Sequence, residues 1–252
     1  MAGKAIMEIY HSADFQVVVK EDQSPLTRAD KSANEIINSI LVSTGIPVIS
    51  EENEQVPYNK RKDWQSCWIV DPLDGTKEFI RRNGEFTVNI ALVNKGEPAL
   101  GVIFAPALDI LYYAIVQEQR AFKLEKASES FGSLIKDSSE IKPVSWDKAI
   151  KVVGSRSHMN EATLEFINDL KQKHQCEVEL ISKGSSLKFC LVAEGEAHFY
   201  PRFAPTMEWD TAAGQAICKA VGLNCSIKGD VKTMVYNREN LLNPHFLVTH
   251  GQ

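Results

Sequence analysis

Apolar residues recur at helical spacing over residues 2–11 and 28–44, and this pattern predicts two amphipathic helices near the start of the chain. Gly45 marks the end of the second helix. The apolar run at 46–50 predicts a short buried strand. The polar stretch 53–63 that follows is typical of a loop.

A second apolar run, residues 66–70, predicts another strand, which we expect to be broken at Asp71 and Pro72. A short helix is expected over residues 75–82. Four further apolar runs are separated by turn residues, so we expect a meander of antiparallel strands at 86–93, 99–105, 111–116 and 121–125.

The second half of the chain follows a polar, serine-rich stretch, and we expect two halves with bounds 1–143 and 144–252. Strands are predicted at 150–155, 178–182 and 197–203, and a closing strand at 246–250. Helices are predicted between them, at 160–173, 185–194 and 210–221. The pattern indicates layered helices and sheets, either α/β or α+β.

Composition is that of an ordinary soluble globular protein, with 44% hydrophobic and 24% charged residues and a net charge of -5. The sequence lacks the basic footprint of a duplex-binding protein, so we expect no nucleic-acid partner. A nucleotide substrate stays open, because a pocket needs few cations. The five cysteines show no paired spacing, which favours a reducing compartment. We see no signal peptide or apolar run long enough to span a membrane, and we expect a cytoplasmic protein.

Acidic residues stand at the ends of predicted elements in four places. Each has an ordinary interpretation: a hairpin turn, a solvated strand end, a helix N-cap, or a first-turn acid that suits the helix dipole. Together they are candidates for one site. The residues are Asp30, Glu51, Asp71, Asp74 and Asp210.

The stretch "DPLDGT" favours chemistry at that site. Pro72 keeps the backbone extended between two aspartates, so both carboxylates project past the end of the strand. Hard divalent cations such as Mg²⁺ prefer such oxygen ligands. Gly75 and Thr76 then offer N–H groups at a helix start, where a phosphate can bind. The hydroxyl of Thr76 can hold an attacking water.

At this point the sequence resembles a known family. "DPLDGTKEF" and "EWDTAAGQAI" are similar to the two signatures of the inositol monophosphatase superfamily, the Mg²⁺-dependent, lithium-sensitive phosphatases. The resemblance covers nearly the whole chain. It implies an α+β fold, the layered α-β-α-β-α sandwich shared with fructose-1,6-bisphosphatases.

The resemblance also implies roles for the acids. Glu51, Asp71, Asp74 and Asp210, with the main-chain carbonyl of Leu73, match metal ligands for about two or three Mg²⁺ ions. Catalysis is implied for Asp30, Thr76 and Glu51, of which Asp30 and Thr76 orient the nucleophilic water. Gly75, Thr76 and Asp210 are expected to contact the substrate as well.

Other stretches resemble one branch of this superfamily, the 3′(2′),5′-bisphosphate nucleotidases of the CysQ type: "SRSH", "KGSSLKFC", "YPRF" and "PTMEWDTAAG". The branch implies removal of the 3′-phosphate of adenosine 3′,5′-bisphosphate (PAP), a by-product of sulfate metabolism, to give AMP. The sulfate donor PAPS is a second expected substrate. His158, Ser185, Lys188 and Arg202 match positions that hold the nucleotide. Their ordinary interpretations are a surface histidine, a solvated lysine and a structural ion pair.

Two alternatives remain open at this stage: an inositol monophosphatase of broad substrate range, and a catalytically idle nucleotide-binding sensor. The full set of acids argues against the idle sensor, because unpaired buried carboxylates are costly. Some bacterial members of this type are peripheral to the inner membrane, but we see no anchor here. The first helix is shorter than is usual in the family, and the sequence leaves the oligomeric state open.

Overall fold

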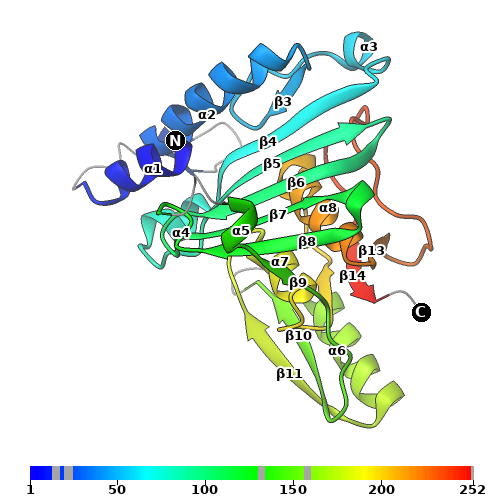
Figure 1. The fold of residues 1–252 in the computed structure, drawn as a ribbon. Coiled ribbons are helices and arrows are strands. Elements are labelled where there is room, and N and C mark those ends of the chain that lie inside the picture. Colours follow the sequence, from blue (N-terminus) through cyan, green and yellow to red (C-terminus); the bar gives the residue numbers. More distant parts are fainter. Residues whose placement is uncertain (13–17, 20–24, 130–133, 156–159, 251–252) are drawn as a thin grey trace.

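The computed structural model describes residues 1–252 apart from 13–17, 20–24, 130–133, 156–159 and 251–252. Its first layer consists of two helices, α1 (Ala2–Tyr10) and α2 (Arg28–Leu41), which pack against each other and cover one face of a large sheet (Figure 1). Both helices lie where the apolar spacing predicts them. A 3₁₀ turn, η1 (Val42–Thr44), extends α2 to Gly45, which adopts a left-handed conformation. Between the helices, β1 (Val18–Val19) pairs with β2 (Pro25–Leu26).

The large sheet has seven strands in chain order, and every neighbouring pair is antiparallel except β3 and β4. This arrangement confirms the predicted meander. The strands are β3 (Val48–Ser50), β4 (Ser66–Asp74), β5 (Thr87–Asn94), β6 (Glu97–Ala105), β7 (Ile110–Ile115), β8 (Arg120–Glu125) and β9 (Ser139–Ile141).

The expected break in β4 is only partly correct. The strand continues through Pro72 to Asp74, but its pairing with β5 shifts register between Asp71 and Asp74. Proline has no N–H to donate and is tolerated in a sheet at such an irregularity. Asp71 and Asp74 therefore both lie in a strand that is still paired with β5.

The opposite face of the sheet is covered by α8 (Ala212–Ala220), with α7 (Leu187–Ala193) packed beside it. The approach of α8 to β6 is very close, since a Cβ at Gly101 would lie 2.4 Å from the carbonyl oxygen of Ala213. Glycine is required there for the helix to reach the sheet. The helix ends before Gly222, as the sequence predicts.

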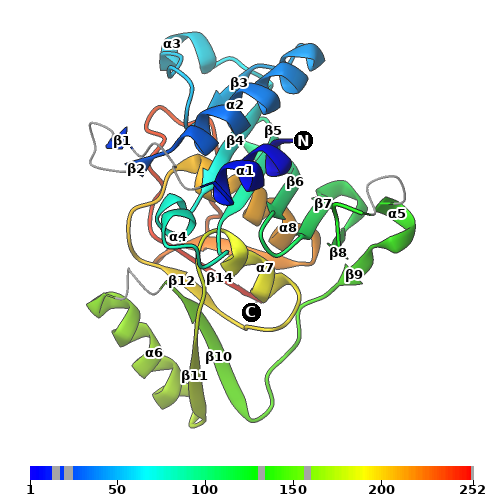
Figure 2. The same cartoon turned by 90° about the vertical axis from the view of Figure 1, so that its left-hand side faces the viewer.

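A second β layer lies beyond these helices. A parallel pair, β10 (Ala149–Gly154) and β11 (Glu177–Ser182), adjoins an antiparallel trio, β12 (Tyr200–Arg202), β14 (Phe246–His250) and β13 (Leu223–Ile227). A parallel bridge between Val152 and Phe199 joins the two groups. The outermost helix, α6 (Glu161–His174), covers this layer (Figure 2). Strand β13 has no counterpart in the sequence-based prediction, because its short alternating pattern follows α8 with only Val221 and Gly222 between them.

The predicted loop at 53–63 contains a helical turn, α3 (Tyr58–Arg61). Arg61 is buried, and its guanidinium donates to three main-chain carbonyls and to the side chain of Asn237. Three of these four partners lie at residues 237–239, far away in the sequence, so local composition could not reveal the turn. Two more short helices are α4 (Thr76–Ile80), within its predicted range, and α5 (Leu134–Asp137).

The fold is therefore α+β with alternating helical and sheet layers, as expected from the sequence. The largest hydrophobic cluster draws residues from both sides of the predicted boundary at 143/144, and the division into two halves stays a prediction. Among the described helices, none combines the length and the apolar character needed to span a bilayer.

Candidate active site

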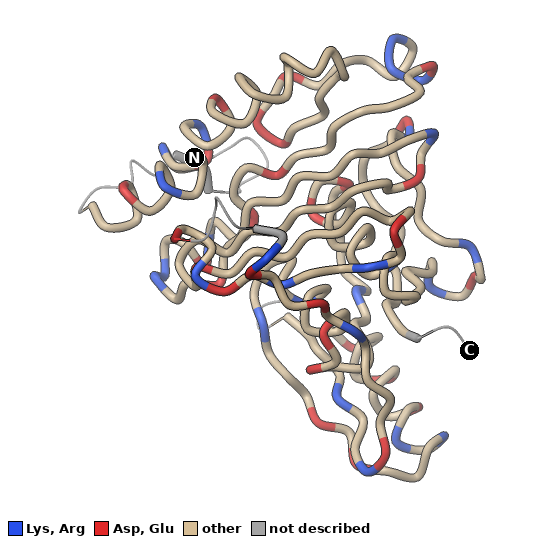
Figure 3. Tube along the Cα trace, in the orientation of Figure 1, with Lys and Arg blue, Asp and Glu red and all other residues tan. Residues whose placement is uncertain are grey.

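Three carboxylates from the two halves of the chain meet at one point. Asp71 and Asp74 come from the end of β4, and Asp210 comes from η4 (Glu208–Asp210), the 3₁₀ turn directly before α8. One oxygen of each lies within 4.8 Å of the others. Charges of both signs are interspersed along the described trace (Figure 3), so this accumulation of acids is a local feature.

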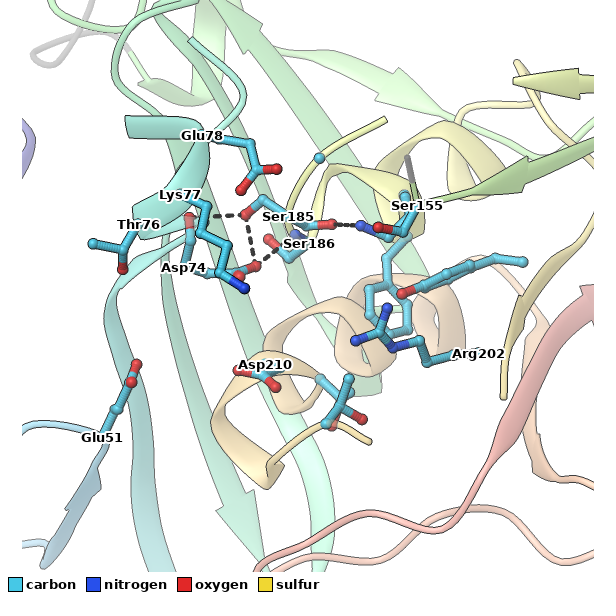
Figure 4. A pocket seen from close by; sticks show the side chains of 17 residues that line it. Glu51, Asp74, Thr76, Lys77, Glu78, Ser155, Ser185, Ser186, Arg202 and Asp210 are labelled. Carbon is cyan, nitrogen blue, oxygen red and sulfur yellow. Dashed lines mark hydrogen bonds between the residues drawn. The ribbon is translucent and has the colours of Figure 1, made fainter. Parts of the chain in front are cut away.

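A pocket of about 230 Å³ opens beside the acids. Glu51, Asp74 and Asp210 line one side, and Arg202 lies at the far end (Figure 4). The helix start after β4 forms part of the wall. Further lining residues are Gly75, Thr76, Lys77, Glu78, Ser155, Gly184, Ser185, Ser186, Lys188, Phe189, Tyr200, Thr206 and Thr211.

Burial and mutual repulsion dominate the electrostatics of the acids. Asp71 is only 1% exposed, and burial raises its pKa well above the usual range, with further repulsion from Glu51, Asp74 and Asp210. Burial, followed by repulsion from Asp74, raises the pKa of Asp210 to about 8. Such a cluster is costly without a compensating cation. The atoms that Asp71, Asp74 and Asp210 offer to a cation are carboxylate oxygens, which suit a hard divalent ion.

Asp30 and Thr76 lie together, although 46 positions separate them. The hydroxyl of Thr76 donates to Asp30 at 3.3 Å and also approaches the carbonyl of Leu73 at 3.4 Å. The other carboxylate oxygen of Asp30 accepts the N–H of Thr27 at 2.7 Å and its hydroxyl at 2.6 Å. Asp30 therefore also lies in the first turn of α2, the ordinary role considered for it, and completes a capping box with the N-cap residue Thr27. Burial raises its pKa.

The side chains of Ser185 and Lys188 form hydrogen bonds within the protein. The Ser185 hydroxyl donates to Asp74 Oδ2 at 2.6 Å. Lys188 is 4% exposed, and its ammonium donates to the carbonyls of Lys183 and Ser185. Burial lowers the pKa of Lys188 to about 8. The interpretation of Lys188 as a solvated charge is therefore wrong.

Arg202 lines the pocket and donates to the carbonyl of Pro205 at 3.0 Å. Its Nε atom is buried and has no hydrogen-bond partner among the described residues. This N–H has no acceptor in the described part of the protein, and the Arg202 side chain lines a pocket where its guanidinium can bind an anion. The predicted nucleotide-binding His158 lies outside the described residues.

Asp210 does not cap α8, because the N-cap position belongs to Thr211. Its carboxylate instead accepts the N–H of Met207 at 2.7 Å, within η4. The N-cap interpretation of Asp210 is therefore wrong, and the carboxylate lines the pocket.

Several residues of the site were not found by sequence reasoning. Thr87 and Asn89 on β5 are buried beneath the acids, and Ser186 donates its N–H to Asp74 at 2.7 Å. The signal available in the sequence was two polar residues at alternate positions of an otherwise apolar strand, "FTVNIALV". Lys77 and Glu78 line the pocket from the first turn of α4.

The layered α+β architecture, with an acidic pocket between the end of β4 and the segments that precede α7 and α8, is that of the sugar-phosphatase class of hydrolases. The chain belongs to the inositol monophosphatase family, whose sequence pattern matches residues 1–250. Enzymes of this family are metal-dependent.

Relatives of known name cover nearly the whole chain. The 3′(2′),5′-bisphosphate nucleotidase CysQ of Salmonella typhimurium is 46% identical over 98% of this chain and 95% of the relative. The protein of the same name from Escherichia coli strain K12 is 44% identical over the same shares.

Solved structures agree on the fold. CysQ from Bacteroides thetaiotaomicron, described as a bacterial member of the inositol monophosphatase family, is 48% identical with a TM-score of 0.87, covering 99% of this chain and 93% of that chain. The extragenic suppressor protein SuhB from Bartonella henselae is 22% identical with a TM-score of 0.74, over 99% and 89% respectively. At that identity the likeness concerns the fold alone.

Proposed function

We propose that this chain is a 3′(2′),5′-bisphosphate nucleotidase that hydrolyses the 3′-phosphate of PAP to give AMP and phosphate, with PAPS as a second substrate. The observation that carries the proposal is one pocket with two chemically distinct ends. Clustered carboxylates form one end, Arg202 lies at the other, and the buried Lys188 also lines the pocket. A substrate with two phosphates matches such a pocket. The relatives of similar length and known name support the same activity.

The proposed cofactor is Mg²⁺, in about two or three ions per site. Its ligands would be Glu51, Asp71, Asp74 and Asp210, with the carbonyl of Leu73. When bound, the ions lower the pKa of water and neutralise charge on the phosphate. The close approach of the carboxylates supports this assignment, because they repel each other unless a cation lies among them.

Asp30 and Thr76 are proposed to orient the attacking water. Since the Thr76 hydroxyl donates its proton to Asp30, its oxygen lone pairs are left to accept a hydrogen bond from that water. The raised pKa of Asp30 makes its carboxylate a better proton acceptor than an exposed aspartate. Glu51, on the same side of the pocket, is the other proposed catalytic acid.

The N–H groups of Gly75 and Thr76 are proposed to hold the phosphate that is cleaved. Arg202 and Lys188 are proposed to hold the rest of the nucleotide, together with Asp210 and His158. A substrate contact from Ser185 also stays a prediction, because in the structure its hydroxyl faces Asp74. A cytoplasmic location likewise stays a prediction.

The test is a parallel measurement of phosphate release with Mg²⁺ from PAP, inositol 1-phosphate and fructose 1,6-bisphosphate. We expect PAP to give the highest kcat/KM, AMP as the nucleotide product, and no turnover with a chelator. Chromatography separates AMP from the 3′-phosphate isomer and so identifies the bond that is cleaved. A clear preference for inositol 1-phosphate would refute the nucleotidase proposal and favour the inositol phosphatase alternative.

A further inference from the structure

Two polar residues of β5 lie directly opposite the two aspartates of β4. In the β4–β5 ladder Asp74 pairs with Thr87, and Asp71 pairs with Asn89. Thr87 and Asn89 are 0% and 1% exposed, and neither lines the pocket. Buried polar groups at these positions need partners within the protein.

The partners of Thr87 come from the second half of the chain. Its hydroxyl lies 2.6 Å from the hydroxyl of Ser185 and 2.7 Å from that of Ser186. Ser186 in turn donates its hydroxyl to Asn89 at 2.7 Å. Since Ser186 donates its one hydroxyl proton to Asn89 and Ser185 donates its own to Asp74, Thr87 contacts both serine oxygens and donates its single proton to one of them.

Ser185 and Ser186 both donate hydrogen bonds to the same carboxylate oxygen of Asp74. Ser185 donates its hydroxyl to Asp74 Oδ2 at 2.6 Å, and Ser186 donates its N–H to the same atom at 2.7 Å (Figure 4). Asn89 approaches it at 3.5 Å. Among the described residues the hydrogen bonds to this carboxylate all fall on Oδ2, which leaves Oδ1 for a cation.

Residues 184–186, here called the 184–186 turn, need such support. Ser185 has a φ of 57°, a left-handed conformation that non-glycine residues rarely adopt. Gly184 donates its N–H to Glu85 at 2.9 Å, and a Cβ on it would lie 2.8 Å from the Glu85 carbonyl. The turn is therefore pressed against the start of β5 and held in an unfavourable conformation by side-chain hydrogen bonds.

We propose that Thr87 is a positioning residue of the phosphatase reaction: its hydroxyl holds the 184–186 turn, and the turn holds Asp74 Oδ2 so that Oδ1 faces the bound cation. The inference rests on the proposed function, because it gives Asp74 a role as cation ligand. In this role Thr87 helps to orient a metal ligand, although Thr87 itself touches neither metal nor substrate.

The deciding experiment compares Thr87→Val, which keeps the shape and removes the hydroxyl, with Thr87→Ser, which keeps the hydroxyl. The probe is Mg²⁺ alone, and its binding is measured by calorimetry. We expect Thr87→Val to bind Mg²⁺ about 10–100-fold more weakly than wild type, the usual cost of losing a partner of a metal ligand. Thr87→Ser should recover most of the affinity.

Kinetics supply a second readout. In Thr87→Val the Mg²⁺ concentration for half-maximal activity should rise by a similar factor, and Thr87→Ser should restore it toward the wild-type value. A purely structural role would lower stability and leave both Mg²⁺ values unchanged. The matched control is Ser66→Ala, which removes a 2.7 Å hydrogen bond to Asn94 at the far end of the same ladder and should change neither value.

Equal Mg²⁺ affinity in folded Thr87→Val and wild type would overturn the proposal, and so would a Thr87→Ser variant as impaired as Thr87→Val. If Thr87→Val does not fold, Ser186→Ala tests the other arm of the network. It keeps the N–H to Asp74 and should bind Mg²⁺ more weakly than wild type; unchanged affinity there rejects the proposal. Mg²⁺ binding can be measured without substrate. A wild-type protein that binds Mg²⁺ but does not hydrolyse PAP would therefore refute the proposed function and leave the proposal about Thr87 intact.

Discussion

Asp71→Asn should make the cation-free protein more stable while abolishing its activity. Asp71 is buried beside Asp74 and Asp210, and its carboxylate accepts one hydrogen bond from the protein main chain, the N–H of Leu73 at 3.0 Å. An asparagine can keep that bond through its amide oxygen. The substitution therefore removes charge with little change of shape.

The expected magnitude follows from the separation of the acids. Two carboxylates 4.8 Å apart repel each other by about 3.5 kcal/mol at an effective dielectric constant of about 20. Protonation of the cluster relieves part of this repulsion at neutral pH, as the raised pKa of Asp71 indicates. We expect a net gain of about 1–3 kcal/mol in the free energy of unfolding, or about 2–4 °C in Tm for each kcal/mol.

Mg²⁺ should narrow or reverse the difference in stability between Asp71→Asn and wild type. A ligand at a hundred times its Kd stabilises the native state by about 2.7 kcal/mol, and the variant loses most of this gain with its ligand. The assay is thermal unfolding followed by circular dichroism, with chelator and with Mg²⁺, beside phosphate release from PAP. Asp63→Asn, at an exposed position, is the control and should shift neither curve.

Two results would refute this reasoning. One is an Asp71→Asn protein that is less stable than wild type in chelator, since the acids would then not be repelling each other in the native state. The other is an undiminished stabilisation by Mg²⁺ together with wild-type turnover, which would remove Asp71 from the cation site.

Three further predictions concern the rest of the site. Arg202→Ala should lower kcat/KM for PAP by about 10–100-fold, the value of a hydrogen bond to a charged group, and should affect a simple phosphate monoester much less; equal losses would remove its substrate role. The pKa of Lys188 is lowered to about 8, so the unfolded chain binds more protons than the native state between pH 8 and 10.5. The free energy of unfolding of wild type should therefore rise relative to that of Lys188→Met as the pH increases over this range. Urea unfolding in the presence of a chelator measures this difference. Glu208 is fully buried and accepts the N–H groups of Asn237 at 2.6 Å and Arg238 at 3.1 Å, so Glu208→Ala should lose about 3–5 kcal/mol of unfolding free energy, and a loss below 1 kcal/mol would contradict the buried network.

Local pattern was sufficient for most elements and for the positions of the acids. The helices that end at Gly45 and Gly222 and the antiparallel meander follow from periodicity and turn residues, which act over a few positions. The acids stand at the ends of these elements, so their approach to a common edge was predictable once the elements were assigned. The roles of these acids stay predictions, although the structure does bring Asp71, Asp74 and Asp210 together.

The orientation of side chains was not predictable in the same way. Lys188 was open to interpretation as a solvated charge, and the structure buries it with a lowered pKa. Arg61 was placed in a loop, whereas it anchors a helical turn to the chain near residue 237. In both cases burial depends on segments that are distant in sequence.

The pair of acids in "DPLDGT" illustrates best what the sequence determines and what the tertiary structure decides. Composition and spacing place Asp71 and Asp74 at the end of a strand, because proline restricts the backbone locally and glycine permits the left-handed conformation that ends the strand. Which oxygen of Asp74 is free for a cation depends on Ser185 and Thr87, and the contact with Ser185 spans 111 positions of the chain. Hydrogen bonds of that separation form only when the segment before α7 packs against the end of β4, so a residue pattern that acts over a few positions cannot specify them.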